Sequence, residues 1–479
     1  MYLIRPGLCP AFQSFPGHQS RQFLASHSEC RGGCIHSCLG VTPGLGGNLC
    51  GRSPFVPGAK GFEEFSGSRR EGYDWSSKLT MRLCFWWNIL SPHQSAYVRE
   101  LAKAHDVVVV AAQRMSDDRA RLGWGVPDFG RANALVAPER ERALNLLGGG
   151  EDTVHLLEGW RGCGLSAFVL RNIPSTARVG VISEAGDARG LAGLLRAVRC
   201  RTDVRRNRRV VDLVLAMGVL GEAWFQRCGV PESKVFPFGY TVEQPDRPEC
   251  QEPRDQLQLP FGVLYLGQFI ECKGVDRLLA ALAGCARLSW RAELVGNGPL
   301  KARCFATTEA LGLSDRIHFL PAQEHSAAMK RLAQADLLVL PSLYDGWGAV
   351  VNEALMRGVP VICTSACGAS DLIRYPWLGS VVAPGSVEGL RRALTESITR
   401  GPRTAARSDK IRAWSRCIGG ESVASYFLSV LGHVYQGGPR PVVPWRIEAR
   451  AEAVREGNPG ITCARDRFGT DSFPPGFAE

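Results

Sequence analysis

Two carboxylates, Asp345 and Glu353, lie eight positions apart in the stretch DGWGAVVNE. Gly346 and Gly348 follow the first carboxylate and leave backbone amides unobstructed where a helix is predicted to begin. Free amides at a helix N-terminus attract phosphate, whereas ionised carboxylates accept hydrogen bonds from hydroxyl groups. This combination suits a ligand with both phosphate and hydroxyl groups, such as a nucleotide sugar. The alternative interpretation is that Asp345 only caps the helix and that Glu353 is a solvated surface residue.

A strand, a helix and a second strand are predicted to position these groups. The apolar run at 337–340 has the length of a buried parallel strand. A compact helical pattern follows at 349–357 and ends at Gly358 and Pro360, residue types that stop helices. A second apolar strand at 359–363 completes a right-handed crossover of the kind that builds doubly wound sheets.

The stretch DGWGAVVNEAL resembles the carboxylate-x7-carboxylate motif of the family-4 glycosyltransferases, which are of the glycosyl transferases group 1 type. In that family two glutamates and a Gly-aromatic-Gly step line the donor sugar site, whereas the first carboxylate here is Asp345, one methylene shorter. The resemblance implies an α/β fold of GT-B architecture, with two Rossmann-like doubly wound domains facing a cleft. It also implies that Asp345 and the amides of Gly346 to Gly348 hold the sugar and diphosphate. Glu353 would hold the ribose hydroxyls.

A second block of the resemblance is GVLYLGQFIECKG, a predicted strand and turn before a helix that begins at Val275. Lys273 lies at the entry to this helix, where an ammonium can meet a diphosphate. The family commonly has Gly-Arg and then Lys-Gly in this turn, but Gln268 occupies the arginine position here. Because Gln268 donates only neutral hydrogen bonds, the resemblance implies that Lys273 takes a larger share in stabilising the leaving diphosphate.

Further along, AELVGNGPL places Gly296 and Gly298 after a predicted strand. A Gly-x-Gly turn alone fits many dinucleotide sites, but no third glycine follows at the Rossmann spacing, which disfavours a nicotinamide or flavin. In the family this turn approaches the nucleotide. The donor-binding residues that the resemblance implies are Gly267, Gln268, Gly274, Gly296, Asn297, Gly298, Gly346, Trp347, Gly348, Ala349 and Asn352.

Strands and helices also alternate in the first half of the chain from residue 81 onward, the pattern of a parallel α/β sheet. Ligands of such sheets bind at the carboxyl ends of the strands. His93 and Gln94, after the first strand, and Glu184, after a later one, are therefore candidates for the acceptor side of the cleft. TVHLLEG places His155 at a strand end, and the family's first domain supplies a histidine that contacts the transferred sugar. Structural roles for these residues are the alternative.

The predicted activity is that of a glycosyltransferase, an enzyme that moves a sugar from a nucleotide-diphosphate sugar to an acceptor hydroxyl of a glycolipid or surface polysaccharide. The resemblance implies retention of configuration without a metal or other cofactor. Catalysis is expected to be shared by Asp345, Glu353, Lys273 and His155, none of which is a secure general base. Two alternatives are a GT-B nucleotide-sugar epimerase and a non-catalytic basic protein that binds anionic nucleic acid or membrane.

Length and composition are those of a globular protein with more than one domain. The 479 residues suffice for two or three cores, and 45% hydrophobic with 22% charged residues is ordinary. No apolar run reaches the roughly 18 residues of a membrane span. Residues 1–80 are turn-rich and are interpreted as a disordered extension or as sequence upstream of a start at Met81. The predicted division continues with an N-terminal acceptor-side domain at 81–242, a linker at 243–259, a C-terminal nucleotide-sugar domain with a closing helix at 260–436 and a disordered tail at 437–479.

The extension contains Cys30, Cys34 and Cys38 near His27 and His36, a group that suggests a metal site. Their spacing matches no common zinc pair, so no metal is predicted. Most of the remaining cysteines occur singly in apolar segments. They are interpreted as small core residues of a protein in a reducing compartment rather than as a disulfide framework.

The chain is basic, with a formal net charge of +11 and a pI near 9.0, which predicts an anionic partner. The densest basic stretch is RAVRCRTDVRRNRR, from Arg196 to Arg209. It is either a solvated helix face or a site of attachment to anionic lipid headgroups. Nucleic acid is not expected because no aromatic residues are interleaved for base stacking. The predicted location is cytoplasmic, peripheral at the inner face of the membrane.

Overall fold

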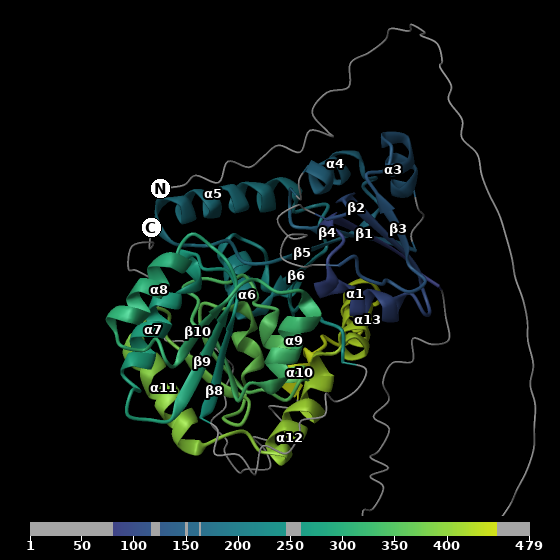
Figure 1. Cartoon of the computed structure of the whole chain (residues 1–479). Helices are drawn as coiled ribbons and strands as arrows, with labels where there is room; N and C mark the ends of the chain where they lie inside the picture. The colour runs from purple at the N-terminus through teal and green to yellow at the C-terminus, as the bar shows by residue number, and fades with distance from the viewer. Residues whose placement is uncertain (1–79, 116–124, 149–151, 162–163, 246–259, 448–479) are drawn as a thin grey trace, which may run out of the picture. The chain divides into compact units, whose positions relative to one another are not determined.

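The computed structural model describes residues 80–447 apart from 116–124, 149–151, 162–163 and 246–259. The predictions for the extension, for its cysteines and histidines, for most of the linker and for the chain beyond residue 447 lie outside the described residues. Within them, the chain forms two parallel sheets, each with its own helices (Figure 1).

The first sheet has seven parallel strands in the order β3-β2-β1-β4-β5-β6-β7. In chain order the strands are β1 (Arg82–Ile89), β2 (Asp106–Gln113), β3 (Asn133–Val136), β4 (Thr153–Glu158), β5 (Arg178–Ser183), β6 (Leu213–Met217) and β7 (Val235–Phe238). The strand order reverses direction between β1 and β4. This is the switch point at which open α/β sheets place their ligands, so the predicted doubly wound topology is confirmed here.

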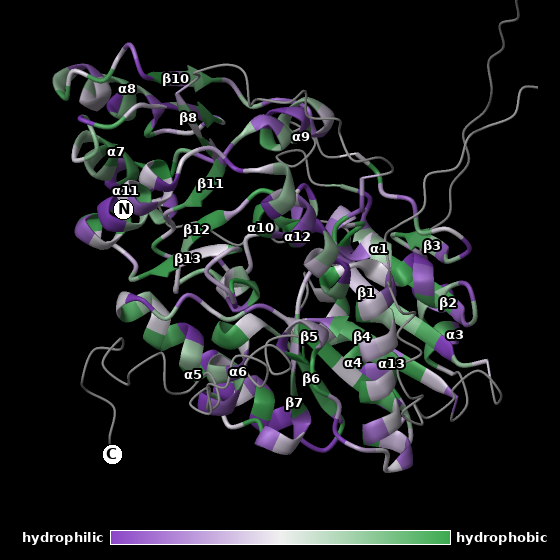
Figure 2. Ribbon diagram, turned by 90° about the horizontal axis from the view of Figure 1, so that it is seen from below, coloured by the Kyte–Doolittle hydropathy of each residue, from purple (hydrophilic) through white to green (hydrophobic). Residues whose placement is uncertain are grey.

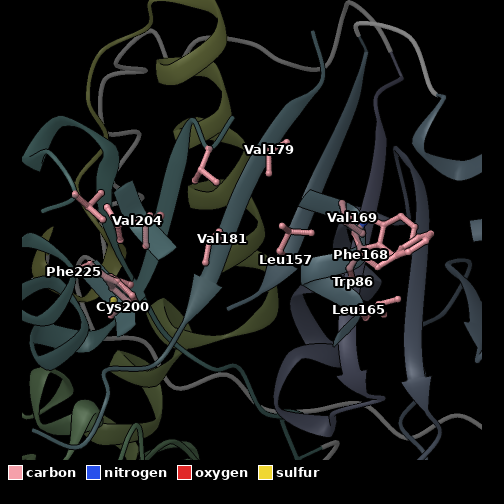
Figure 3. Packing of buried hydrophobic residues seen from close by; sticks show 14 of the residues in the cluster. Trp86, Leu157, Leu165, Phe168, Val169, Val179, Val181, Cys200, Val204 and Phe225 are labelled. Carbon is pink, nitrogen blue, oxygen red and sulfur yellow. The ribbon is translucent and has the colours of Figure 1, made fainter. Parts of the chain in front are cut away.

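Apolar side chains hold the first sheet and its helices together. The helices are α1 (Pro92–Leu101), α3 (Arg140–Leu147), α4 (Leu165–Asn172), α5 (Gly190–Asn207) and α6 (Gly218–Arg227). Figure 3 shows part of this core, in which Leu157 and Val181 of the sheet pack in one cluster with Phe168 of α4 and with Val204 of α5. The central strands are apolar on both faces because helices cover both, which is why their sequences are continuous apolar runs.

The second sheet has six parallel strands in the order β10-β9-β8-β11-β12-β13. They are β8 (Phe261–Leu266), β9 (Trp290–Val295), β10 (Ile317–Leu320), β11 (Leu337–Leu340), β12 (Val361–Thr364) and β13 (Gly379–Val382). The helices that follow them are α7 (Val275–Ala283), α8 (Lys301–Ala310), α9 (His325–Gln334), α10 (Val350–Met356), α11 (Val387–Arg400) and α12 (Ala405–Ser415). The order again reverses, here between β8 and β11, so this sheet has its own switch point.

The chain then returns to the first sheet through α13 (Gly420–Gln436), which packs against α1. Phe427 of α13 lies 6.1 Å from the ring of Phe85 and 6.2 Å from that of Tyr97. Tyr426 donates a hydrogen bond to the carbonyl of Pro237 at 2.8 Å. The prediction of a closing helix that crosses back to the first domain is therefore confirmed.

The prediction of a disordered tail from residue 437 is wrong for residues 437–447, the part that the structure describes. Val443 and Trp445 are buried, with 0% and 1% of their surface exposed. Trp445 Nε1 donates to Asp371 Oδ2 at 2.7 Å, and Arg446 bonds both Asp371 and Glu222 of α6. Residues 444–447 are helical, and Trp445 and Arg446 are the side chains through which this helical turn is anchored. Among the described helices, none combines the length and apolar character needed to cross a membrane.

Candidate active site

A cavity of about 1170 Å³ is lined by residues at the carboxyl ends of strands from both sheets. From the first sheet it receives Asn88, near the end of β1, and Glu158, the last residue of β4. From the second sheet it receives Gly267, which follows β8, and Gly296, which follows β9. Strand ends of this kind are where open α/β folds bind ligands.

The structure brings most of the predicted site residues to this cavity. From the second sheet's side they are Gly267, Gln268, Lys273, Gly296, Asn297, Asp345, Gly348, Ala349 and Glu353. From the first sheet's side they are His93, Gln94 and Glu184. The roles of these residues stay predictions, whereas their common location is a property of the fold.

On the second sheet's side of the cavity, a charged contact joins Lys273, at the end of the 3₁₀ turn η6 (Glu271–Lys273), to Asp345. Lys273 Nζ donates to Asp345 Oδ2 at 2.6 Å, and the two side chains are 22% and 13% exposed. Burial disfavours the charged ammonium, but the Asp345 carboxylate outweighs it, so the pKa of Lys273 lies above its ordinary value. The ammonium therefore keeps its charge at neutral pH.

The alternative interpretation of Asp345 as a helix cap is wrong. The helix α10 begins at Val350 after the N-cap residue Ala349, and no side chain makes a cap hydrogen bond there. The backbone amide of Asp345 instead donates to the carbonyl of Ala366 at 2.9 Å, which fixes the loop before the helix. Because α10 is only seven residues long, the fixed charge of Lys273 is a stronger attraction for an anion than the helix end.

Glu353 is buried rather than solvated, with 8% of its surface exposed. Its Oε1 lies 3.7 Å from Nδ1 of His325, at the start of α9. Burial raises the pKa of Glu353 to about 7, and the nearby Arg357 guanidinium limits the rise. The pKa of His325 lies below its ordinary value, first because of burial and then because of Arg357. When it is ionised, a carboxylate that burial has removed from water can accept hydrogen bonds from a ligand's hydroxyl groups.

Two glycines let the backbone come close to other atoms of the site. At Gly296, where φ is 150°, an added Cβ would lie 1.9 Å from the carbonyl oxygen of Gly267. At Gly346 an added Cβ would lie 1.9 Å from Oε2 of Glu184, which belongs to the first domain. The second close approach brings an acceptor-side candidate against the loop that contains Asp345.

On the first sheet's side, α1 presents two predicted residues to the cavity. Ser91 caps the helix, its side chain accepting a hydrogen bond from the amide of His93 at 3.3 Å. The ring of His93 lies 5.6 Å from that of Tyr240, whose hydroxyl donates to Glu184 Oε1 at 2.8 Å. Gln94 is 3% exposed and accepts a hydrogen bond from the Tyr97 hydroxyl.

The prediction that His155 looks into the cleft is wrong. His155 lies in the middle of β4, pairs in register with Cys84 and Val179 and is 0% exposed. Its Nδ1 accepts a hydrogen bond from Trp86 Nε1 at 3.2 Å, and burial lowers its pKa to about 4. The residue that β4 presents to the cavity is Glu158, so the strand ends three residues later than the prediction assumed.

Trp347 and Asn352, predicted to bind the donor, also lie elsewhere. Trp347 is 1% exposed, and its Nε1 donates to Asn352 Oδ1 at 2.8 Å. Asn352 Nδ2 donates to the carbonyl of Tyr240 at 3.0 Å, and the ring of Trp347 lies 6.4 Å from that of Trp445. These side chains join the two domains and the tail instead of lining the cavity. Three further predicted glycines are also absent from the lining, namely Gly274, Gly298 and Gly346.

Several residues that line the cavity were not among the predicted site residues. Glu158 was detectable as the last residue of the run TVHLLE, just before a glycine. Arg99 lines the first sheet's side and bonds Glu243 through two nitrogens. His325 is the first residue of α9, in a stretch without any motif, and Arg357 is one turn of helix after Glu353.

Solved structures with a similar fold include two proteins that the chain covers almost completely. The structure of Anabaena HepE in complex with UDP has a TM-score of 0.56 and 17% identity, covering 74% of this chain and 100% of that one. The structure of WaaG, a glycosyltransferase of lipopolysaccharide biosynthesis, has a TM-score of 0.50 and 19% identity, covering 73% and 99%. With two parallel Rossmann-like sheets, the chain has the GT-B fold of these proteins, as predicted.

The second half of the chain matches a family model and several curated relatives. Residues 253–414 match the family model of glycosyl transferases group 1, which confirms the resemblance found in the DGWGAVVNEAL and GQFIECKG motifs. Curated relatives include the lipopolysaccharide glucosyltransferase WaaG of Escherichia coli, 33% identical over 156 residues, and the teichuronic acid biosynthesis glycosyltransferase TuaC, named as putative, of Bacillus subtilis, 32% identical over 171 residues. The matched segments cover 32% and 34% of this chain and 41% of each relative's length.

Proposed function

We propose that this protein is a glycosyltransferase that moves a sugar from a nucleotide-diphosphate sugar to an acceptor hydroxyl. The observation that supports this most is the contact between Lys273 and Asp345 in the cavity that Glu353 also lines. A cation, a carboxylate paired with it and a second, buried carboxylate suit a diphosphate, a sugar and a ribose in one ligand. The family match of residues 253–414 covers all three residues.

The proposed donor lies along the second sheet's side of the cavity. The diphosphate binds Lys273, with Gln268 and Asn297 beside it as neutral donors, and Asp345 accepts hydrogen bonds from the sugar. Glu353 accepts the ribose hydroxyls, and the base lies toward the start of α9, where the cavity is lined by Ala328 and Met329. A uridine nucleotide is the first choice, because HepE, with the same fold, has been solved with UDP and with UDP-glucose.

The proposed reaction needs no metal because a fixed ammonium can receive the charge that develops on the leaving group. The bond between the anomeric carbon and the diphosphate oxygen breaks, and its electron pair leaves on the diphosphate beside Lys273. The acceptor oxygen then bonds the anomeric carbon from the same face, which retains the configuration, and its proton passes to the departing diphosphate. The two domains exclude water from this step and so favour transfer over hydrolysis.

The proposed acceptor is a glycan or a glycolipid, bound at the first sheet's side by His93, Gln94 and Glu184. Relatives named for lipopolysaccharide and teichuronic acid synthesis support a role in the synthesis of a surface polysaccharide. Such acceptors are assembled at membranes, so the protein would act from the cytoplasm at the membrane surface.

The donor proposal is tested by thermal stabilisation of the full chain with UDP-, GDP-, ADP- and TDP-sugars, with NAD and a short oligonucleotide as controls. A ligand at about 100 times its Kd adds about 2.7 kcal/mol of stability. We expect one nucleotide sugar to stabilise the wild type and Lys330→Ala, an exposed lysine of α9 outside the cavity, but not Lys273→Ala. Stabilisation by the oligonucleotide alone would favour the alternative of a non-catalytic anion-binding protein. Conversion of the nucleotide sugar in the absence of an acceptor, a separate measurement, would favour the epimerase.

A further inference from the structure

The helix α5 exposes an unusual amount of apolar surface. The large apolar side chains that are exposed on this helix are Leu191 at 83%, Leu194 at 37%, Leu195 at 60% and Val198 at 49%. Elsewhere among the described residues such side chains are scattered along the chain, whereas these four fall within eight consecutive residues. A cluster of this kind rimmed by polar residues marks a surface that contacts another molecule.

The inner side of α5 is already used for folding. Gly193, Cys200 and Val204 are buried, and Cys200 and Val204 belong to the core cluster that includes Phe225 (Figure 3). Because a helix repeats every 3.6 residues, the positions opposite this buried stripe form a single outward row. The cluster of exposed apolar residues therefore cannot turn inward without removing the buried residues from the core.

The outward row has an apolar first half and a basic second half. Leu191, Leu195 and Val198 lie at positions i, i+4 and i+7 of one face, and Arg205 continues the same row at i+14 with Arg206 beside it. Both arginines are exposed. Figure 2 shows the two characters as green and purple segments on the ribbon of α5.

The arginines of this segment are largely unneutralised. Between residues 190 and 209 there are seven arginines and a single acidic residue, Asp203, which is bound by Arg161. Arg196 and Arg201 bond backbone carbonyls. Within the part of the chain that the structure describes, the arginines of this segment without an ion pair include Arg199, Arg205 and Arg206. The segment therefore combines a strong positive charge with exposed leucines.

We propose that α5 docks on an anionic lipid membrane, with Leu191, Leu195 and Val198 in the headgroup and acyl boundary and the arginines on the lipid phosphates. A helix lying in the membrane plane uses both kinds of side chain, since apolar insertion and attraction to anionic headgroups add. Nucleic acid would use the arginines but not the leucines, and α5 has no aromatic side chain for base stacking. A second copy of the chain would bring two sets of like charges together.

This docking rests on the proposed function and extends it, because α5 belongs to the same domain as the proposed acceptor residues and would hold that domain at the surface where a lipid-linked acceptor is found. Binding to the membrane does not itself require sugar transfer. The two can therefore fail separately, since vesicle binding is measured without a nucleotide sugar and donor binding is measured without lipid.

The experiment is flotation of the full-length protein with vesicles of phosphatidylcholine alone or mixed with phosphatidylglycerol. We expect binding only to the mixed vesicles. Arg205→Gln with Arg206→Gln should weaken it about thirtyfold, since each arginine near the surface contributes about fivefold. Leu191→Gln with Leu195→Gln should weaken it at least about tenfold and leave a residual binding that salt abolishes. The four substitutions are at exposed positions and should leave the melting temperature and the nucleotide-sugar stabilisation unchanged.

Control substitutions come from the other domain, where Arg303 of α8 and Leu311, the C-cap residue of that helix, are exposed. Arg303→Gln with Leu311→Gln should bind vesicles like the wild type. The proposal is overturned if the arginine and leucine variants bind as tightly as this control, or if the wild type ignores phosphatidylglycerol. It is also overturned if light scattering shows that the wild type is a dimer and that Leu191→Gln with Leu195→Gln is a monomer. The same holds if Arg205→Gln with Arg206→Gln weakens binding to an oligonucleotide but not to the vesicles.

Discussion

Replacing Glu353 with glutamine should stabilise the protein at alkaline pH and weaken its binding of nucleotide sugar. In the folded protein burial raises the pKa of Glu353 from 4.5 to about 7. Below pH 4.5 Glu353 is protonated in both the folded and the unfolded state, so its ionisation does not change the free energy of unfolding. As the pH rises, the unfolded chain ionises first, and the free energy of unfolding falls until the pH passes about 7. Above about pH 7 Glu353 is charged and can accept the ribose hydroxyls, and in the same range it lowers the free energy of unfolding.

The size of this effect follows from the difference between the two pKa values. A rise from 4.5 to about 7 corresponds to about 3 kcal/mol at pH 8 and to less than about 1 kcal/mol at pH 5. The side chain is only 11% exposed, so solvent screening reduces the figure little. Glutamine has nearly the same shape but cannot ionise. Glu353→Gln should therefore gain most of the difference at pH 8 and little at pH 5.

The assay is urea unfolding of the wild type and Glu353→Gln at both pH values, followed by tryptophan fluorescence. His325 is the neighbouring titratable group, 3.7 Å away on α9, and Arg357 is the nearby fixed cation. The variant His325→Asn should retain the pH dependence of the wild type if Glu353 is its source. In parallel, loss of a charged acceptor for the ribose should weaken nucleotide-sugar binding by about ten- to hundredfold. Equal changes in stability at pH 5 and pH 8 would refute the reasoning.

Three further predictions concern the contacts around the cavity. Lys273→Ala should abolish donor binding and destabilise the fold, because Asp345 is left without its cation. Adding Asp345→Asn to this variant should restore the stability, measured by urea unfolding, but not the donor binding. Gly346→Ala should displace the Glu184 carboxylate, whose oxygen lies 1.9 Å from the added methyl position, and lower the transfer rate more than the Kd for donor; an unchanged rate would show that this close approach is dispensable. Trp445→Ala should cost about 3–5 kcal/mol of stability by calorimetry because the side chain is 1% exposed and bonded to Asp371; a loss below about 1 kcal/mol would show that the tail is not an anchor.

Local patterns were sufficient to predict the strands and the turns that follow them. The apolar run at 337–340 is the strand β11, and the predicted helix at 349–357 is α10 with its two caps. Boundaries were less certain, because the second strand starts at Val361 rather than 359. The residues before it, Val359 and Pro360, have the apolar composition of the strand but connect it to the helix.

The errors arose where a side chain's direction depends on distant segments. Nothing near Trp347 in the sequence shows that its ring lies among Tyr240, Asn352 and Trp445. The burial of Trp445 is equally hidden, since its hydrogen-bond partner Asp371 lies 74 residues earlier in the chain. The prediction for His155 is wrong for a different reason: the strand β4 continues to Glu158, so the residue at its end that lines the cavity is Glu158.

The most direct test of the proposed site is a crystal structure of the protein with the nucleotide sugar that stabilises it. The diphosphate should lie within hydrogen-bond distance of Lys273 Nζ, the ribose hydroxyls should bond Glu353, and the sugar should contact Asp345. A nucleotide bound outside this cavity, or bound inside it with the diphosphate away from Lys273, would contradict the proposed site and the transfer chemistry that depends on it.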